Sequence, residues 1–169
     1  MTERLEIVQL NQLTKEQLAQ LASLLIGVVE DGASIGFLPP LTEHEAIAYW
    51  SGVLEPDHVL WIAVLGEEIV GSVQLQLAAK RNASHRAEIA KLIVAPVHRR
   101  KGIARLLMQA AHERAKQERR SLIVLDTREG DPSNFLYSSL GYQTVGRIPR
   151  FAQSASGQLE ATVIYYLEL

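Results

Sequence analysis

The strongest structural signal in this chain lies in Val94-Ala95-Pro96-Val97-His98-Arg99-Arg100-Lys101-Gly102-Ile103-Ala104. An apolar run over residues 89–94 leads into this segment, and apolar residues at helical spacing follow it. The expected order is therefore strand, basic turn and helix. Such a turn points several backbone N–H groups at one spot, beside the positive end of a helix dipole. Because such a spot binds phosphate, the sequence predicts a site for a phosphorylated ligand.

The composition is typical of one globular domain. The 169 residues suit a single domain over 1–169, and 47% of them are apolar. The 17 Lys and Arg nearly balance the 19 Asp and Glu, and the formal net charge of -2 gives no support to a nucleic-acid partner. The sequence contains no cysteine, which excludes disulfides, thiolate zinc sites and a cysteine nucleophile.

The sequence shows no targeting, membrane or metal-binding signal. Residues 1–7 are charged and lack the apolar core of a signal peptide. The longest apolar stretch, Leu21 to Val29, is far too short to span a bilayer. The histidines are scattered singly along the chain, so we expect no metal site. We expect a cytoplasmic protein with no membrane partner.

Strand and helix patterns alternate along the chain. The expected strands are 5–10, 58–65, 69–77, 88–94, 121–125, 143–148 and 161–167. The expected helices are about 15–29, 43–53 and 103–118, with a short one from Asp131-Pro132 to Gly141. Capping boxes at Thr14-x-x-Gln17 and Thr42-x-x-Glu45 mark the first two helix starts.

This element order predicts an α+β domain. The sheet should be mixed and mostly antiparallel, with about six to seven strands and helices on both faces. One parallel pair is expected between strands 88–94 and 121–125, because a helix crosses over between them. The run 121–125 is continuously apolar, which is typical of a strand buried on both faces.

Two motifs of this chain are Arg99-x-x-Gly102-x-Ala104 in the basic turn and Leu136-Tyr137-Ser138-Ser139-Leu140-Gly141-Tyr142 further on. Together they resemble the GNAT superfamily of N-acetyltransferases: the first is similar to the family's acyl-CoA pyrophosphate loop, and the second resembles its later helix with a tyrosine. More narrowly, 32–37, 125–127 and 145–149 resemble the branch that contains the tabtoxin-resistance acetyltransferase. The resemblance implies a three-layer domain in which a splayed parallel strand pair holds acetyl-CoA.

The same resemblance implies how the coenzyme is bound. Arg99 and Arg100 would neutralise the diphosphate, N–H groups from Arg100 to Arg105 would donate to it, and the strand backbone would pair with the pantetheine arm. Many family members have an Asn where Gly130 stands, and the nearby Asn134 would take its place. The predicted coenzyme contacts are Leu92, Ile93, Val94, Arg99, Arg100, Lys101, Gly102, Ile103, Ala104, Arg105 and Asn134. The alternative is a solvated charge run, although positive residues oppose the dipole at a helix start.

Tyr137 is the predicted general acid. In the family its counterpart stands near the thioester sulfur. A phenol with a pKa of about 10 stays protonated at neutral pH and can give its proton to a leaving thiolate. The alternative is a half-buried tyrosine whose hydroxyl faces water.

Two carboxylates are candidates for activating the amine, which must be neutral to attack. Asp126, the first choice, should end strand 122–125 at the edge where ligands bind. Glu88, the second, matches the position of a base in some family members. The alternatives are a strand-end aspartate that caps Arg128 or a backbone N–H, and a surface charge at Glu88. Either carboxylate could also only bind the ammonium group and leave proton removal to water.

The leading hypothesis is an acetyl-CoA-dependent N-acetyltransferase that acts by direct transfer, with no metal and no acyl-enzyme. The acceptor would be a primary amine of a small, amino-acid-like or toxin-like molecule, and the backbone of 88–94 would stabilise the oxyanion. Trp50 and Phe37 are expected to shape the acceptor pocket. Because family members often dimerise, a homodimer is a further expectation.

Three alternatives remain open. The protein could acetylate protein α-amines or lysines, or it could be a non-catalytic acyl-CoA-binding module. Gly32-x-Ser34-x-Gly36 also has the letters of a hydrolase nucleophile elbow. That elbow needs a strand before it and a helix after it, whereas a helix is expected before this one.

Overall fold

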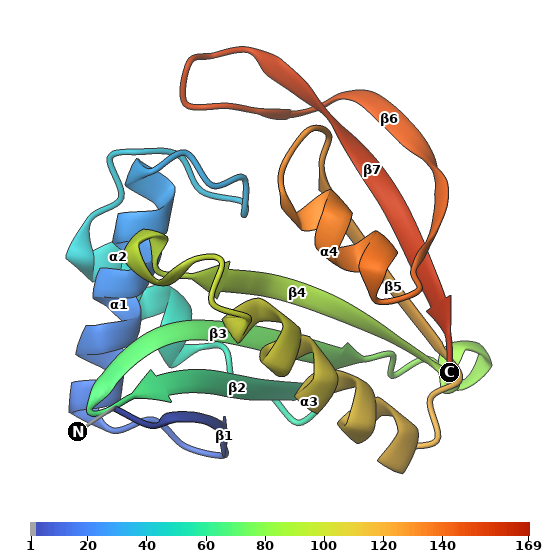
Figure 1. Ribbon diagram of the computed structural model, residues 1–169, viewed down its shortest axis with the longest axis horizontal. Helices are drawn as coiled ribbons and strands as arrows, with labels where there is room; N and C mark the ends of the chain where they lie inside the picture. The colour runs from blue at the N-terminus through green and yellow to red at the C-terminus, as the bar shows by residue number, and fades with distance from the viewer. Residues whose placement is uncertain (1–2) are drawn as a thin grey trace.

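A seven-stranded sheet organises residues 3–169, which the computed structural model describes (Figure 1). Residues 1 and 2, which belong to the charged 1–7 segment and the expected 1–169 domain, lie outside that range. The strands are β1 (Leu5–Leu10), β2 (His58–Leu65), β3 (Glu68–Leu77), β4 (Arg86–Val94), β5 (Leu122–Arg128), β6 (Gln143–Gln153) and β7 (Leu159–Glu168). The helices are α1 (Lys15–Glu30), α2 (Glu43–Ser51), α3 (Ile103–Gln117) and α4 (Ser133–Ser139).

The sheet order is β1-β2-β3-β4-β5-β7-β6. Neighbouring strands are antiparallel except β4 and β5, which are parallel because α3 crosses over between them. The predicted mixed, mostly antiparallel sheet is therefore confirmed. In the described part of the chain, no helix is long and apolar enough to cross a membrane.

Both predicted capping boxes are present. The Thr14 hydroxyl accepts from the Gln17 N–H at 3.1 Å, and the Gln17 side chain accepts from the Thr14 N–H at 3.0 Å. Thr42 and Glu45 exchange the same two bonds at the start of α2. Each box satisfies N–H groups that a helix start leaves unpaired, which fixes where the two helices begin.

The sheet separates two hydrophobic cores (Figure 1). On one face, α3 buries Leu107 and Met108 completely. On the other face, α1 and α2 pack together, and the fully buried Trp50 donates its indole N–H to the Leu21 carbonyl at 2.9 Å. The expectation that Trp50 shapes the acceptor pocket is therefore wrong, because this bond and its burial make it part of the core.

The parallel strands β4 and β5 form a fork (Figure 1). They pair only at Arg86–Leu122, Ala87–Ile123 and Glu88–Val124, and beyond these three pairs they diverge. Just beyond these pairs, between Ala90 and Ile93, the register of β4 against β3 shifts, and Lys91 there adopts a left-handed φ of 51°. This bulge bends β4 away from β5, so the expected splayed strand pair is confirmed.

The strand β5 differs from the prediction in length and in burial. It continues through Arg128 because it keeps pairing with β7, so Asp126 lies inside the strand and does not end it. Leu122 and Val124 are half-buried, whereas the apolar run predicted burial on both faces. The reason is that α1 packs against β3 and β4 and leaves the same face of β5 less covered.

Candidate active site

The fork between β4 and β5 opens into a cleft of about 840 Å³. This is the size of a pocket for a large small-molecule ligand. The cleft is lined by Glu88, Leu92, Ile93, Val94, Arg99, Arg100, Gly102, Ile103, Ala104, Arg105, Asp126 and Tyr137 among the predicted residues. Lys101 and Asn134 are the predicted site residues that do not line it. Loop 31–36, which follows α1, forms a further wall.

The basic turn presents free backbone donors to this cleft. Arg100 and Gly102 have left-handed φ values of 61° and 81°, which turn the chain sharply before α3. Within residues 3–169 the N–H groups of 100–105 have no bonded acceptor, whereas the next one, of Leu106, bonds to the Gly102 carbonyl. These N–H groups lie at the positive end of the α3 dipole, so the turn suits a diphosphate.

The edge of β4 is available for an extended ligand. Past Glu88 this edge has lost its partner β5, so the backbone from 89 to 94 faces the cleft without a neighbouring strand. A ligand with amide groups can pair with such an edge as an added strand would. The predicted contacts of Leu92 and Val94 with a pantetheine arm fit this geometry.

Arg99 is bound by the protein itself. Its Nη1 atom lies 2.6 Å from Oδ2 of Asp31, which follows α1 directly. The two side chains are 44% and 45% exposed, so the ion pair lies at the rim of the cleft. This pair could not be predicted from the sequence, because Asp31 lies 68 residues before Arg99.

Tyr137 is buried and lines the cleft. It is 5% exposed, and its ring lies 5.7 Å from that of Tyr142 and 5.9 Å from that of Tyr165. The alternative of a half-buried tyrosine is therefore wrong. Burial raises the pKa of the Tyr137 hydroxyl, and the negative charge of Asp126 raises it further. The hydroxyl thus keeps its proton at neutral pH and above.

The carboxylate of Asp126 on β5 acts on that of Glu88 on β4 across the fork. Burial raises the pKa of Glu88, and the nearby charge of Asp126 raises it further. Asp126 accepts a hydrogen bond from the Thr162 hydroxyl at 2.7 Å. The alternative in which Asp126 caps Arg128 is wrong, since the Arg128 guanidinium binds Asp131.

Lys91 is a cleft residue that sequence reasoning missed. Its Nζ atom donates to the Ile35 carbonyl at 2.5 Å and lies 5.7 Å from the centre of the Phe37 ring. Desolvation lowers the pKa of Lys91, while the charges of Asp126 and Glu88 raise it. The only hint of this role in the sequence was a single lysine inside the apolar run 89–94. The bulge that turns Lys91 into the cleft could not be predicted from the sequence.

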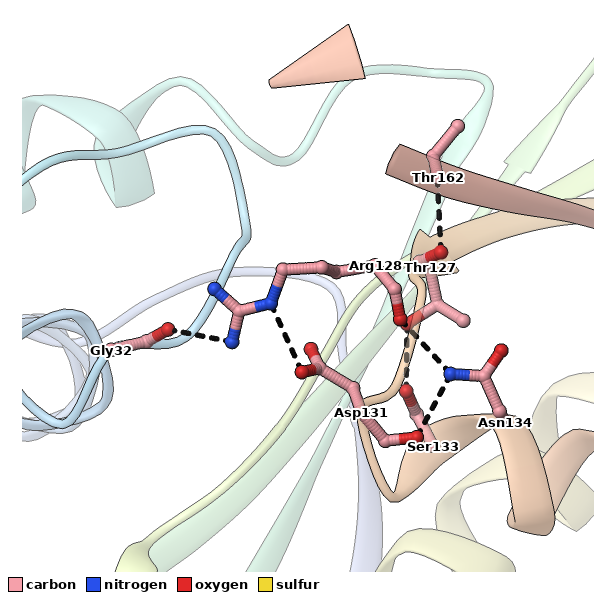
Figure 2. A network of polar contacts seen from close by, with 7 residues as sticks. All are labelled: Gly32, Thr127, Arg128, Asp131, Ser133, Asn134 and Thr162. Carbon is pink, nitrogen blue, oxygen red and sulfur yellow. Dashed lines mark hydrogen bonds and ion pairs between the residues drawn. The ribbon is translucent and has the colours of Figure 1, made fainter. Parts of the chain in front are cut away.

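Figure 2 shows the polar network where β5 meets α4. The Arg128 guanidinium donates to Asp131 and to the Gly32 carbonyl, both at 3.0 Å, and so ties β5 to loop 31–36. The Asn134 amide donates to the carbonyls of Arg128 and Asp131 at 2.9 and 2.8 Å. Its oxygen accepts from the Tyr165 hydroxyl. Because both amide hydrogens of Asn134 are used within the protein, its position gives no support to the predicted coenzyme contact.

Two further features of the described residues bear on other chemistries. Ser34 lies in the loop after α1, so the strand that a nucleophile elbow needs does not precede it. Within residues 3–169, no group of three or more His, Cys, Asp or Glu could hold a metal ion.

Comparison with known proteins adds a family match and a close relative. The model of the acetyltransferase (GNAT) family matches residues 14–142. An uncharacterized N-acetyltransferase of Azospirillum brasilense, from the hisH-hisA intergenic region, is 35% identical over 104 residues. That match covers 60% of this chain and 62% of the relative, which is less than two thirds of its length.

Solved structures share the fold along nearly the whole chain. An N-acetyltransferase from Staphylococcus aureus Mu50 matches with a TM-score of 0.83 and 16% identity, over 98% of both chains. The putative acetyltransferase yncA from Salmonella typhimurium, solved with its cofactor acetyl-CoA, matches with a TM-score of 0.80 and 16% identity. The second match covers 98% of this chain and 94% of the other.

Proposed function

Since the chain belongs to the GNAT family of acetyltransferases, we propose that it transfers the acetyl group of acetyl-CoA directly to a primary amine of a small molecule. The observation that carries the proposal is the fork of β4 and β5. It gathers residues 100 and 102–105, whose N–H groups are free, the buried Tyr137 and the carboxylates Glu88 and Asp126 around one cleft. The family uses acetyl-CoA, and the Salmonella relative was solved with it.

The residues of the cleft fit this coenzyme. The N–H groups of 100–105 would hold the diphosphate, with Arg99 and Arg100 supplying positive charge. The open edge of β4 would bind the pantetheine arm through Leu92 and Val94. Bound there, acetyl-CoA would supply the acetyl group as a thioester. N–H groups of β4 would stabilise the negative charge that develops on the carbonyl oxygen.

The two sides of the fork would handle the protons. The Tyr137 hydroxyl, protonated and buried, would give its proton to the departing thiolate. Glu88, whose pKa is raised, would take the proton of the acceptor's ammonium group, directly or through water. Asp126, held by Thr162, would bind that ammonium group. This assignment reverses the order expected from the sequence, because the raised pKa favours Glu88 as the base.

Two features support a small acceptor. Loop 31–36 is tied across the cleft by Lys91 and Arg128, which gives the acceptor side a fixed wall. Residues 32–37 of that loop also carry part of the resemblance to the tabtoxin-resistance branch. A wall held in this way suits a compact amine better than a protein chain.

A single assay tests the proposal against its alternatives. The purified chain is incubated with acetyl-CoA and a panel of small amines, amino acids, and peptides with a free α-amine or lysine. Released thiol and product mass are measured, and coenzyme A binding is followed by calorimetry. Thiol release with small amines supports the proposal, and release with peptides alone would indicate protein acetylation. Binding without release on any acceptor would indicate a non-catalytic module, and no binding would refute the proposal.

A further inference from the structure

Three basic side chains hold loop 31–36, and each comes from an element that lines the coenzyme cleft. The bonds are Arg99 to the Asp31 carboxylate at 2.6 Å, Arg128 to the Gly32 carbonyl at 3.0 Å and Lys91 to the Ile35 carbonyl at 2.5 Å. Loop 31–36, the wall on the acceptor side of the cleft, is thus held in place by side chains from the elements that would bind the coenzyme.

The Arg99 bond differs from the other two. Lys91 and Arg128 lie on strands and hold the loop through its neutral carbonyls, although Arg128 also binds Asp131 outside the loop. Arg99 lies in the turn that presents N–H groups for a diphosphate, and its partner is an anion. Its side chain is 44% exposed, so the pair is weak enough for a stronger anion to compete.

Asp31 depends on this guanidinium. It caps the C-terminus of α1, where the helix dipole is negative and a carboxylate is unfavourable. The last turn of α1 contains no basic residue, and its final residue, Glu30, adds a second negative charge. Arg99 is therefore the cation that compensates Asp31.

We propose that Arg99 is shared between the acceptor wall and the coenzyme's diphosphate, so that Asp31 opposes coenzyme binding and bound coenzyme loosens the end of α1. This inference rests on the proposed function, which puts the diphosphate in the turn. One guanidinium then lies between two anions that repel each other. Because such coupling is reciprocal, a carboxylate that weakens coenzyme binding is itself held less firmly once the coenzyme binds. Bound coenzyme would then loosen only the Asp31 end of loop 31–36, while Lys91 and Arg128 still hold the rest of it.

The matched test compares Asp31→Asn with Glu30→Gln. Both variants remove one negative charge from the end of α1, but only Asp31 is paired with Arg99. Calorimetry with coenzyme A should give a Kd that is about threefold to tenfold lower for Asp31→Asn than for the wild type, and within about twofold for Glu30→Gln. In an Arg99→Gln background, Asp31→Asn should lose most of its effect.

Hydrogen exchange gives a second measurement, on the wild-type protein alone. The N–H groups of Gly32 and Ala33 bond to the carbonyls of Val29 and Val28 at 3.0 and 2.9 Å and report on the end of α1. Saturating coenzyme A should speed their exchange.

The outcomes separate this inference from the proposed function. A wild-type protein that does not bind coenzyme A would refute the proposed function. If the wild type binds but Asp31→Asn binds equally or more weakly, Asp31 only orients Arg99 and the inference is wrong. Slower or unchanged exchange at Gly32 and Ala33 on binding would overturn it in the same way.

Discussion

The chemistry proposed for Tyr137 comes from where its hydroxyl lies. The ring is enclosed by Tyr142 and Tyr165, while the side chain still lines the cleft. Burial holds the pKa of this phenol above its ordinary value, so the group is a proton donor at every pH at which the protein would normally be assayed. The same neighbourhood would leave a phenylalanine at 137 well packed.

Tyr137→Phe should lower kcat by about a hundredfold or more, because general acid catalysis is typically worth that much. Affinity for coenzyme A should stay nearly the same, since in the proposed complex the hydroxyl would touch only the reacting end of the coenzyme. Tyr142→Phe is the matched control: it removes a hydroxyl that bonds His112 at 2.7 Å outside the cleft. Steady-state kinetics and calorimetry measure both quantities, and unchanged turnover in Tyr137→Phe would remove this residue from the mechanism.

The pH profile should separate Glu88 from Asp126 as the base. If Glu88 is the base, kcat/KM falls as the pH drops through its raised pKa. Lys91→Met removes a positive charge that lowers this pKa, so the acid limb should move to higher pH. Asp126→Asn removes a negative charge that raises it, so the limb should move to lower pH. Loss of activity at every pH in Asp126→Asn, with Glu88→Gln still active, would assign the base to Asp126.

Individual residues also mark the limit of sequence reasoning. The resemblance of the basic turn and of the Tyr137 motif to the GNAT family was enough to predict that both would reach one cleft. The roles of Lys91 and Asp31 could not be predicted, since Lys91 binds loop 31–36 and Asp31 lies in it, and no periodicity in the sequence encodes the path of that loop. Asp126 was expected at a strand end because apolar residues stop at Leu125, although pairing with β7 continues the strand.

Among the elements, the basic turn before α3 depends on an unusual backbone conformation. Gly102 has a φ of 81°, and a Cβ there would meet nothing within 4 Å. The need for glycine at this position is therefore conformational. The turn must reverse direction while it keeps the N–H groups of 100–105 pointed at one place.

Gly102→Ala should weaken coenzyme A binding by at least about tenfold, because a relaxed φ would turn donors that together bind the diphosphate. Gly157→Ala is the control: Gly157 has a similar φ of 86°, in the loop between β6 and β7. Both variants should lose about 1–2 kcal/mol of stability in denaturant unfolding. Equal coenzyme affinity in the two variants would contradict the role given to the turn.

Most elements were predictable because their patterns are local. The capping boxes fixed the starts of α1 and α2, and the crossover helix required a parallel β4–β5 pair. The closing strands were predicted too short, as β6 reaches Gln153 and β7 begins at Leu159. The ends of these strands pair with each other outside both cores and leave Phe151 and Leu159 exposed, so hydrophobic periodicity gave no signal there.

For the molecule as a whole, binding of coenzyme A should raise the free energy of unfolding. A ligand that binds only the folded chain at about one hundred times its Kd adds about 2.7 kcal/mol to the free energy of unfolding. For a chain of this size, that raises Tm by about 5–10 °C. Coenzyme A should give this rise in a thermal melt, whereas adenosine, which lacks the diphosphate, should leave Tm almost unchanged. A coenzyme A melt that overlays the free protein would contradict the site.

The short seam between β4 and β5 has a mechanical consequence. Three residue pairs, 86–88 against 122–124, form the ladder between the strands before the seam and those after it. A tensile load across the sheet would act on this short ladder. Its hydrogen bonds would break one after another, starting beside the fork at Glu88 and Val124. The sheet would separate into two parts. One would carry Glu88 and the basic turn, and the other would carry Asp126 and Tyr137. A molecule bound across the fork would hold these two parts together and so resist the separation.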